Sequence, residues 1–78
     1  MIEVGQKIRI LLYMNGLTQV WLIGQLRERG IVTDKTEMSS VLKGTRVGKK
    51  ANLILQTSIE ILKEYQDGHG KKIEQFLP

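Results

Sequence analysis

Apolar residues recur at helical spacing from the start of the chain. Between Val4 and Met14 they return about once per turn on one face, the pattern of a helix with one buried side. The members of that face are Val4, Ile8, Leu11 and Leu12. Asn15-Gly16 follows, and both residues tolerate the left-handed backbone that closes helices. We therefore predict a first helix over Val4 to Met14.

A second helix is predicted after Thr18, whose hydroxyl can accept a hydrogen bond from an unpaired N–H of the first turn. Its buried face consists of Leu22, Ile23 and Leu26. Gly24 lies inside this helix and costs about 1 kcal/mol relative to Ala, so we expect a neighbouring helix to approach closely there. The segment Arg27-Glu28-Arg29 extends the helix by almost a turn, and Gly30 ends it.

A third, shorter helix is predicted from Asp34 to Gly44. Asp34 can cap its first turn, and Glu37 three residues later completes a pattern like the capping box. Gly44 ends the helix after little more than two turns, so packing must hold it, because so short a helix is marginal alone. The residues expected to face inward are Met38, Val41 and Leu42.

A longer helical pattern runs from about Lys49 to Tyr65. Its inward positions are Ala51, Ile54 or Leu55, Ser58, Ile59, Leu62 and Tyr65. Gln56-Thr57-Ser58 leaves open whether this is one helix or two, and Asp67-Gly68-His69-Gly70 is predicted to break the helix and to place His69 in a loop. No segment alternates for long enough to form a sheet. We therefore predict an all-α fold of four or five helices over residues 1–67, followed by a short C-terminal tail over 68–78.

The length and composition of the chain narrow the class of protein. A length of 78 residues corresponds to one domain, and a hydrophobic content of 41% suffices for one compact core. The absence of Cys excludes disulfides and thiolate metal sites, which suits the cytoplasm. No apolar run approaches the ~18 residues needed to cross a membrane, and the first residues lack the basic lead and cleavage site of a signal peptide. We expect a soluble, cytoplasmic protein.

The formal net charge of +4 fits a polyanionic partner only weakly, and the distribution of charge is more informative. Every charged residue between Leu42 and Leu53 is basic: Lys43, Arg46, Lys49 and Lys50. A cationic stripe beside the third predicted helix is what contact with phosphates requires. A solvated basic loop is the alternative, and the charge pattern alone leaves both open.

The stretch from Thr18 to Arg46 has the outline of a helix-turn-helix, in which the second helix enters the major groove of DNA. Its landmarks resemble those of the lambda-repressor-like, Cro/CI-type helix-turn-helix family: Thr18-Gln19, Leu22, Leu26, Gly30, Asp34, Met38-Ser39 and Gly44. Within that family the string WLIGQLRERGIVTDKTEMSSVLKGTR is similar to small regulators of bacteriophages and mobile elements of Gram-positive bacteria. The resemblance covers Ile8 to about Tyr65. It departs from the family at Arg27-Glu28-Arg29, because the family turn usually follows the landmark Leu directly with Gly.

The resemblance implies a sequence-specific DNA-binding transcriptional regulator of the repressor type. Lys35, Thr36 and Ser39 would read bases: Lys35 suits guanine O6 and N7, and Thr36 suits a thymine methyl group. Gln19 would contact a phosphate and brace the first base-reading residue. The resemblance and the basic stripe together give the expected phosphate contacts: Thr18, Gln19, Ser40, Lys43, Thr45, Arg46, Lys49 and Lys50.

Several of these residues have a purely structural alternative. Thr18 and Asp34 are expected to act as helix caps, which does not exclude contact with a phosphate. Arg46 has Glu37 as a possible ion-pair partner. Trp21 either packs against the long C-terminal helix or stays half exposed, and we favour packing.

The expected partner is double-stranded DNA, bound by a homodimer as is usual in the family. The candidate dimer surfaces are the face of the long helix around Ile61 and Tyr65 and the tail residues Ile73-Phe76-Leu77. The rival is a helical protein-interaction module, such as an antirepressor or adaptor, which the acidic residues Glu60, Glu64 and Asp67 and the apolar tail favour. A single His and the lack of a Gly-rich phosphate loop argue against an enzyme, and we expect no cofactor, metal or membrane partner.

Overall fold

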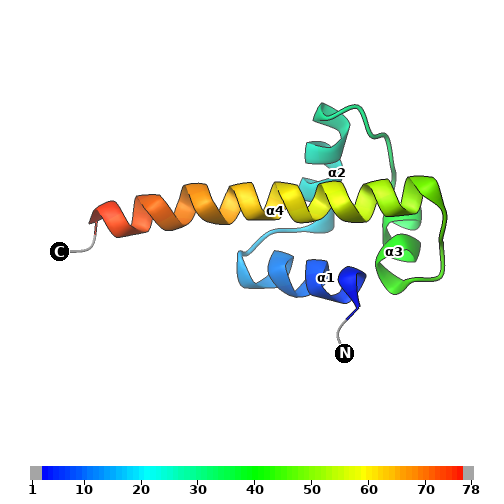
Figure 1. The fold of residues 1–78 in the computed structure, drawn as a ribbon, viewed down its shortest axis with the longest axis horizontal. Helices are drawn as coiled ribbons and strands as arrows, with labels where there is room; N and C mark the ends of the chain where they lie inside the picture. The colour runs from blue at the N-terminus through cyan, green and yellow to red at the C-terminus, as the bar shows by residue number, and fades with distance from the viewer. Residues whose placement is uncertain (1–2, 77–78) are drawn as a thin grey trace.

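The computed structural model describes the backbone of residues 3–76 and the side chains of residues 3–68. Over that range the chain is all-α, as predicted, and forms four helices, with no strand among the described residues (Figure 1). The helices are α1 (Val4–Met14), α2 (Gln19–Glu28), α3 (Lys35–Lys43) and α4 (Lys49–Phe76).

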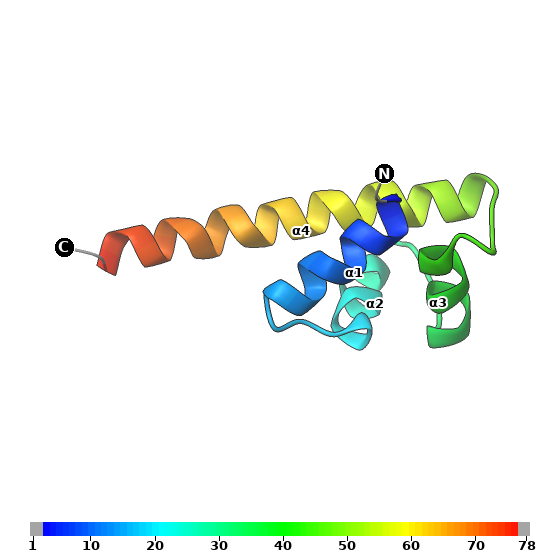
Figure 2. The same ribbon diagram turned by 90° about the horizontal axis from the view of Figure 1, so that it is seen from below.

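The long helix α4 forms one side of the molecule, and the three shorter helices pack along the other (Figures 1 and 2). α1 contacts both α3 and α4, and α2 and α3 contact each other and α4. α4 extends beyond the other three helices at its C-terminal end (Figure 1). In the described part of the chain, no helix is both long and apolar enough to cross a lipid bilayer.

One apolar core joins the four helices, and its burial holds the short α3 in place. The predicted inward faces of α1, α2 and α3 supply much of it, namely Ile8, Leu12, Leu22, Leu26, Met38, Val41 and Leu42. α4 adds Ala51, Ile54, Ile61 and Leu62. Leu11, Ile23, Leu55 and Ile59 are partly buried against this core.

The caps predicted for α2 and α3 are confirmed by their geometry. The Thr18 hydroxyl accepts from the backbone N–H of Trp21 at 3.1 Å, and the Asp34 carboxylate accepts from that of Glu37 at 2.7 Å. Gly44, just after α3, has a φ of 82°, the left-handed conformation that glycine adopts without strain. Gly30, two residues after the end of α2, has a φ of 84°.

The close helix approach predicted at Gly24 is wrong, and the position that needs glycine is Gly5. A Cβ at Gly24 would meet nothing within 4 Å, whereas a Cβ at Gly5 would overlap the backbone carbonyl of Leu42. Gly5 therefore lets α1 lie directly on the end of α3. Val4, assigned to the buried face, is half exposed instead, because Gly5 occupies the place next to α3.

α4 is one continuous helix, so the break predicted at Asp67-Gly68-His69-Gly70 is wrong. Gln56-Thr57-Ser58 likewise does not divide it. Glycine lowers helix propensity but does not block the helical conformation, and His69 lies within α4 rather than in a loop. The side chains of Ile73 and Phe76, and all of Leu77, lie outside the described residues.

The dimer surface predicted around Ile61 and Tyr65 is also wrong, because this face of α4 is used inside the fold. Ile61 is buried in the core. The ring of Tyr65 packs edge-on against Trp21, with centroids 5.4 Å apart, which confirms the predicted packing of Trp21 on the long helix. These two residues are therefore part of the contact between α4 and the rest of the domain.

Candidate nucleic-acid interface

α2 and α3 meet through Gln19 and Ser39. The Ser39 hydroxyl lies 3.4 Å from the Gln19 side-chain oxygen, a long hydrogen bond between the first residue of α2 and the middle of α3. The first turns of both helices lie on the side of the molecule away from α4 (Figure 2). The resemblance implied that Gln19 braces the first base-reading residue, Lys35, but its contact is with Ser39, one turn further along.

The outward face of α3 carries the residues expected to read bases. Lys35 and Thr36 are exposed in its first turn, and Ser39 is half-buried beside Gln19. Ser40 is half-buried and Lys43 is exposed at the C-terminal end of the helix. The structure therefore brings these five residues onto one helix while Met38, Val41 and Leu42 fill the core from its other side.

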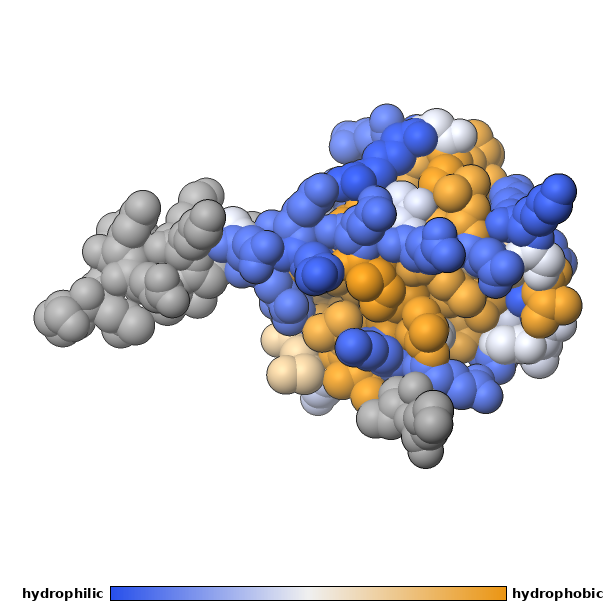
Figure 3. Space-filling model, viewed as in Figure 1, coloured by the Kyte–Doolittle hydropathy of each residue, from blue (hydrophilic) through white to orange (hydrophobic). Residues whose placement is uncertain are grey.

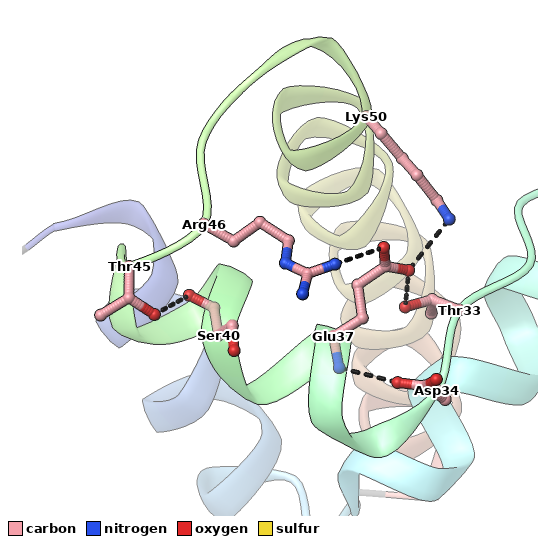
Figure 4. A network of polar contacts seen from close by, with 7 residues as sticks. All are labelled: Thr33, Asp34, Glu37, Ser40, Thr45, Arg46 and Lys50. Atoms are coloured by element: carbon pink, nitrogen blue, oxygen red, sulfur yellow. Dashed lines mark hydrogen bonds and ion pairs between the residues drawn. The ribbon is translucent and has the colours of Figure 1, made fainter.

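The loop after α3 is fastened to the helix by its own hydrogen bonds. The Thr45 hydroxyl donates to the backbone carbonyl of Ser40 at 3.1 Å (Figure 4). The same carbonyl accepts from the backbone N–H groups of Thr45 at 3.0 Å and Arg46 at 3.2 Å. The Thr45 hydroxyl is thus engaged within the fold, and the loop holds Arg46 in a defined place beside α3.

Glu37 is the centre of a polar network that sequence reasoning assigned only in part (Figure 4). Its carboxylate accepts from the Thr33 hydroxyl at 2.6 Å. It also pairs with the Lys50 ammonium at 3.0 Å and the Arg46 guanidinium at 3.1 Å. The ion pair with Arg46 is one of the alternatives drawn from the sequence. The reciprocal half of the capping box is not formed, because the carboxylate turns to these three partners instead of back to Asp34.

These contacts set the electrostatics of the network. The hydrogen bond from Thr33, followed by the hydrogen bond from Lys50, lowers the pKa of Glu37 below the ordinary value of 4.5. The nearby charges of Lys50 and Arg46 act in the same direction, and partial burial opposes them. Glu37 is therefore ionised at neutral pH and is only 16% exposed, whereas the side chains of Arg46 and Lys50 are each about half exposed.

The eight residues expected to contact phosphates differ in the partners that they have within the fold. Arg46 and Lys50 pair with Glu37. Lys43 and Lys49 are exposed and make no ion pair with any other described residue. Thr18 caps α2, and Gln19 contacts Ser39. Ser40 is half-buried, and its backbone carbonyl accepts from the Thr45 hydroxyl.

A hollow of about 490 Å³ lies on the flank of α3 beside the Glu37 network. Its wall includes Thr36, one of the residues expected to read bases, together with both cations that Glu37 holds. Arg27, at the end of α2, lies in the same wall. The remaining lining residues are Val32, Thr33 and Asp34, with Glu37 itself.

Sequence reasoning missed Arg9 and Tyr13, on the other flank. They lie one turn apart on α1 and line a shallow hollow of about 190 Å³ that Gln19 also lines. Tyr13 is 86% exposed, although it is aromatic. The spacing of four residues was visible in the sequence, but only the turn at Asn15-Gly16 brings this face of α1 next to the start of α2.

The segment Arg27-Glu28-Arg29, which interrupts the resemblance drawn from the sequence, has a structural role. α2 ends at Glu28, and Arg29 then reaches α4, where its guanidinium pairs with Glu64 and lies 4.0 Å from Glu60. Two of the acidic residues that favoured the protein-interaction reading are therefore partners within the fold.

No family model matches the chain, and neither the curated proteins nor the solved structures contain a significant match. Among the described residues, no three His, Asp or Glu side chains come together as a metal site. Function is therefore inferred from the geometry around α2 and α3.

Proposed function

We propose that this protein is a sequence-specific DNA-binding transcriptional regulator that places α3 in the major groove. The observation that carries the proposal is the pairing of α2 and α3 through Gln19 and Ser39, with Lys35 and Thr36 on the open side of the same surface. A helix held by its inner face and open on its outer face has the form that major-groove reading requires. The similarity to Cro/CI-type regulators agrees with this arrangement.

The proposal gives the exposed cations a role. Lys43 at the end of α3 and Lys49 at the start of α4 stand on either side of one loop, where they would contact the DNA backbone. The first turn of α2 would offer backbone N–H groups and Gln19 to a phosphate on the other side of α3. Phosphate contacts of this kind position the helix, and the bases select the site.

A single α3 reads few base pairs, so useful specificity requires two copies on paired half-sites. We therefore also propose a cytoplasmic regulator that binds DNA as a homodimer. This doubling predicts that the preferred DNA site is a palindrome or near-palindrome. Its half-sites should lie about one helical turn apart, or a multiple of it.

The test is to bind the purified protein to random-sequence duplex DNA at several salt concentrations and then to select the tightest binders. A steep fall of affinity with rising salt, together with enrichment of one short motif, supports the proposal. Absence of binding at low salt overturns it.

A second candidate function, a helical protein-interaction module, is favoured by one surface. Figure 3 shows apolar side chains exposed on the face formed by α1 and α4. A hollow of about 530 Å³ there is lined by Val4, Leu55 and Ile59, with polar residues around them. Binding of a protein through this apolar groove would depend little on salt, so the same salt series separates the two functions.

A further inference from the structure

We propose that Glu37 is a positioning residue that holds Arg46 and Lys50 as a pair around one DNA backbone phosphate, next to the bases that the first turn of α3 reads. The inference rests on the proposed function and deepens it. It assigns a role in DNA binding to an acidic residue, which simple electrostatics would count as unfavourable near a polyanion.

The geometry of the network is the first step. Glu37 accepts hydrogen bonds from Thr33 before α3, and it pairs with Arg46 after α3 and Lys50 in α4 (Figure 4). Two long side chains that would otherwise sample many rotamers are thereby fixed on one carboxylate. Ordering such side chains in advance removes part of the entropic cost of binding.

The capacity of the two cations is the second step. The guanidinium of Arg46 has five N–H donors and the ammonium of Lys50 has three, so each retains donors after its contact with Glu37. Both side chains remain about half exposed. With Glu37 ionised, the three groups carry a net charge of +1, and the two cations face solvent beside the hollow on the flank of α3.

The position of the network is the third step. Thr36 lines the same hollow as Arg46 and Lys50, and Arg27 adds a third cation to its wall. A phosphate seated there would belong to the strand that passes the first turn of α3. The clamp would therefore fix the depth and register of Lys35 and Thr36 against the base edges.

The deciding variant is Glu37→Gln, which keeps the shape of the side chain and removes its charge. Glu28→Gln is the matched control, because Glu28 is an exposed residue at the far end of α2 and the change in net charge is the same. Each protein is titrated with the selected duplex and with an unrelated duplex of equal length, over a salt series and well below its thermal midpoint.

We expect Glu37→Gln to weaken binding to the unrelated duplex by a factor of about five and to the selected duplex by more, because Lys35 and Thr36 then also lose their register against the bases. It should also flatten the salt dependence by roughly one to two units, one for each cation released from position. Glu28→Gln should leave the salt slope unchanged. Binding by Glu37→Gln that is as tight as wild type or tighter, with an unchanged slope, overturns the inference.

A variant that lacks both cations shows whether Glu37 acts by positioning them or by a general effect on the structure. In Arg46→Ala/Lys50→Ala protein, Glu37→Gln should change affinity less than about twofold, because its partners are gone. An equal loss in both backgrounds overturns the inference. If Glu37→Gln does not fold, Glu37→Asp replaces it: the charge remains, the reach is shorter, and a weakened affinity with a flatter slope is again expected. A wild-type protein that binds no duplex overturns the proposed function itself, which distinguishes that failure from a failure of the clamp alone.

Discussion

The ring of Trp21 meets the ring of Tyr65 edge-on, at an interplanar angle of 74° and a centroid distance of 5.4 Å. This contact joins the first turn of α2 to α4, on the same helical turn that carries Gln19. The orientation of the proposed DNA-binding unit on the long helix therefore depends on an aromatic pair outside the fully buried core.

Replacing Trp21 by Ala should lower the free energy of unfolding by about 2 kcal/mol, less than for a fully buried aromatic residue, since Trp21 is only partly buried. Urea denaturation followed by circular dichroism measures this. Tyr13→Ala is the control, because Tyr13 is 86% exposed and its removal should change stability by under about 0.5 kcal/mol. Equal effects of the two substitutions would contradict the role assigned to the aromatic pair.

Gly5 in α1 and Gly24 in α2 should respond in opposite directions to Ala. Gly5→Ala places a methyl group against the Leu42 carbonyl and should destabilise the fold by about 1–3 kcal/mol. Gly24→Ala meets no atom and should stabilise it by about 0.5–1 kcal/mol through better helix propensity. Thermal unfolding of wild type and the two variants measures these changes in stability. A stabilising Gly5→Ala would show that α1 does not lie on α3 as described.

Acid should weaken the fold through Glu37. Its pKa is lowered in the folded protein by Thr33, Lys50 and Arg46, so its contribution is fully present above the ordinary value of 4.5. That contribution is lost as the pH falls below 4.5 toward the lower folded-state pKa. The measurement is the free energy of unfolding between pH 7 and 3 for wild type and Glu37→Gln. The variant should show a shallower decline in this range, and parallel curves would contradict the prediction.

Lys35 and Lys49 should differ in what they contribute to DNA binding. Lys35→Ala should cost on the order of 1–3 kcal/mol at one base position and relax the preference there. Lys49→Ala should weaken binding to every sequence and flatten the salt slope by roughly one unit. Competition with single-base variants of the selected site, repeated at several salt concentrations, measures the base preference and the salt slope. A uniform loss for Lys35→Ala would make it a phosphate contact instead.

Arg9 should support binding from the flank opposite Arg46. If the backbone passes the hollow that Arg9 and Tyr13 share with Gln19, Arg9→Ala should weaken binding to all duplexes and flatten the salt slope by roughly one unit. Lys63→Ala on α4 is the control, since it removes the same charge from a residue lining the groove of α1 and α4. Indistinguishable salt slopes for the two variants would exclude Arg9 from the interface.

The helices and their ends were predictable because they depend on local chemistry. Thr18, Asp34 and Gly44 act within one turn of their own position, so a single sequence contains the information. The continuity of α4 was not predictable in this way: the sequence at Asp67-Gly68 disfavours a helix, yet the helix passes through it.

The remaining errors concern contacts between distant residues. Nothing near Gly5 in the sequence indicates that Leu42 will lie against it, and Ile61 can be assigned to the core only once the neighbours of α4 are known. The partners of Glu37 likewise come from three separate segments, of which only Arg46 was foreseen. Glu37 lies three residues after Asp34, and this spacing suggested that its side chain would cap the helix. Tertiary packing instead makes its carboxylate the partner of Thr33, Arg46 and Lys50.

Different residues of α3 attach the helix to the domain and face the proposed DNA, and this separation affects how such a protein can change its target. The residues that fasten the helix, Glu37, Met38, Val41 and Leu42, are distinct from the exposed Lys35 and Thr36, whereas Ser39 also contacts Gln19 of α2. The proposed base preference could therefore be changed at Lys35 and Thr36 while the attachment of the helix stays intact. A library varied at these two positions on an unchanged scaffold should yield folded proteins with new targets, so the proposed specificity of this small domain is separable from its stability.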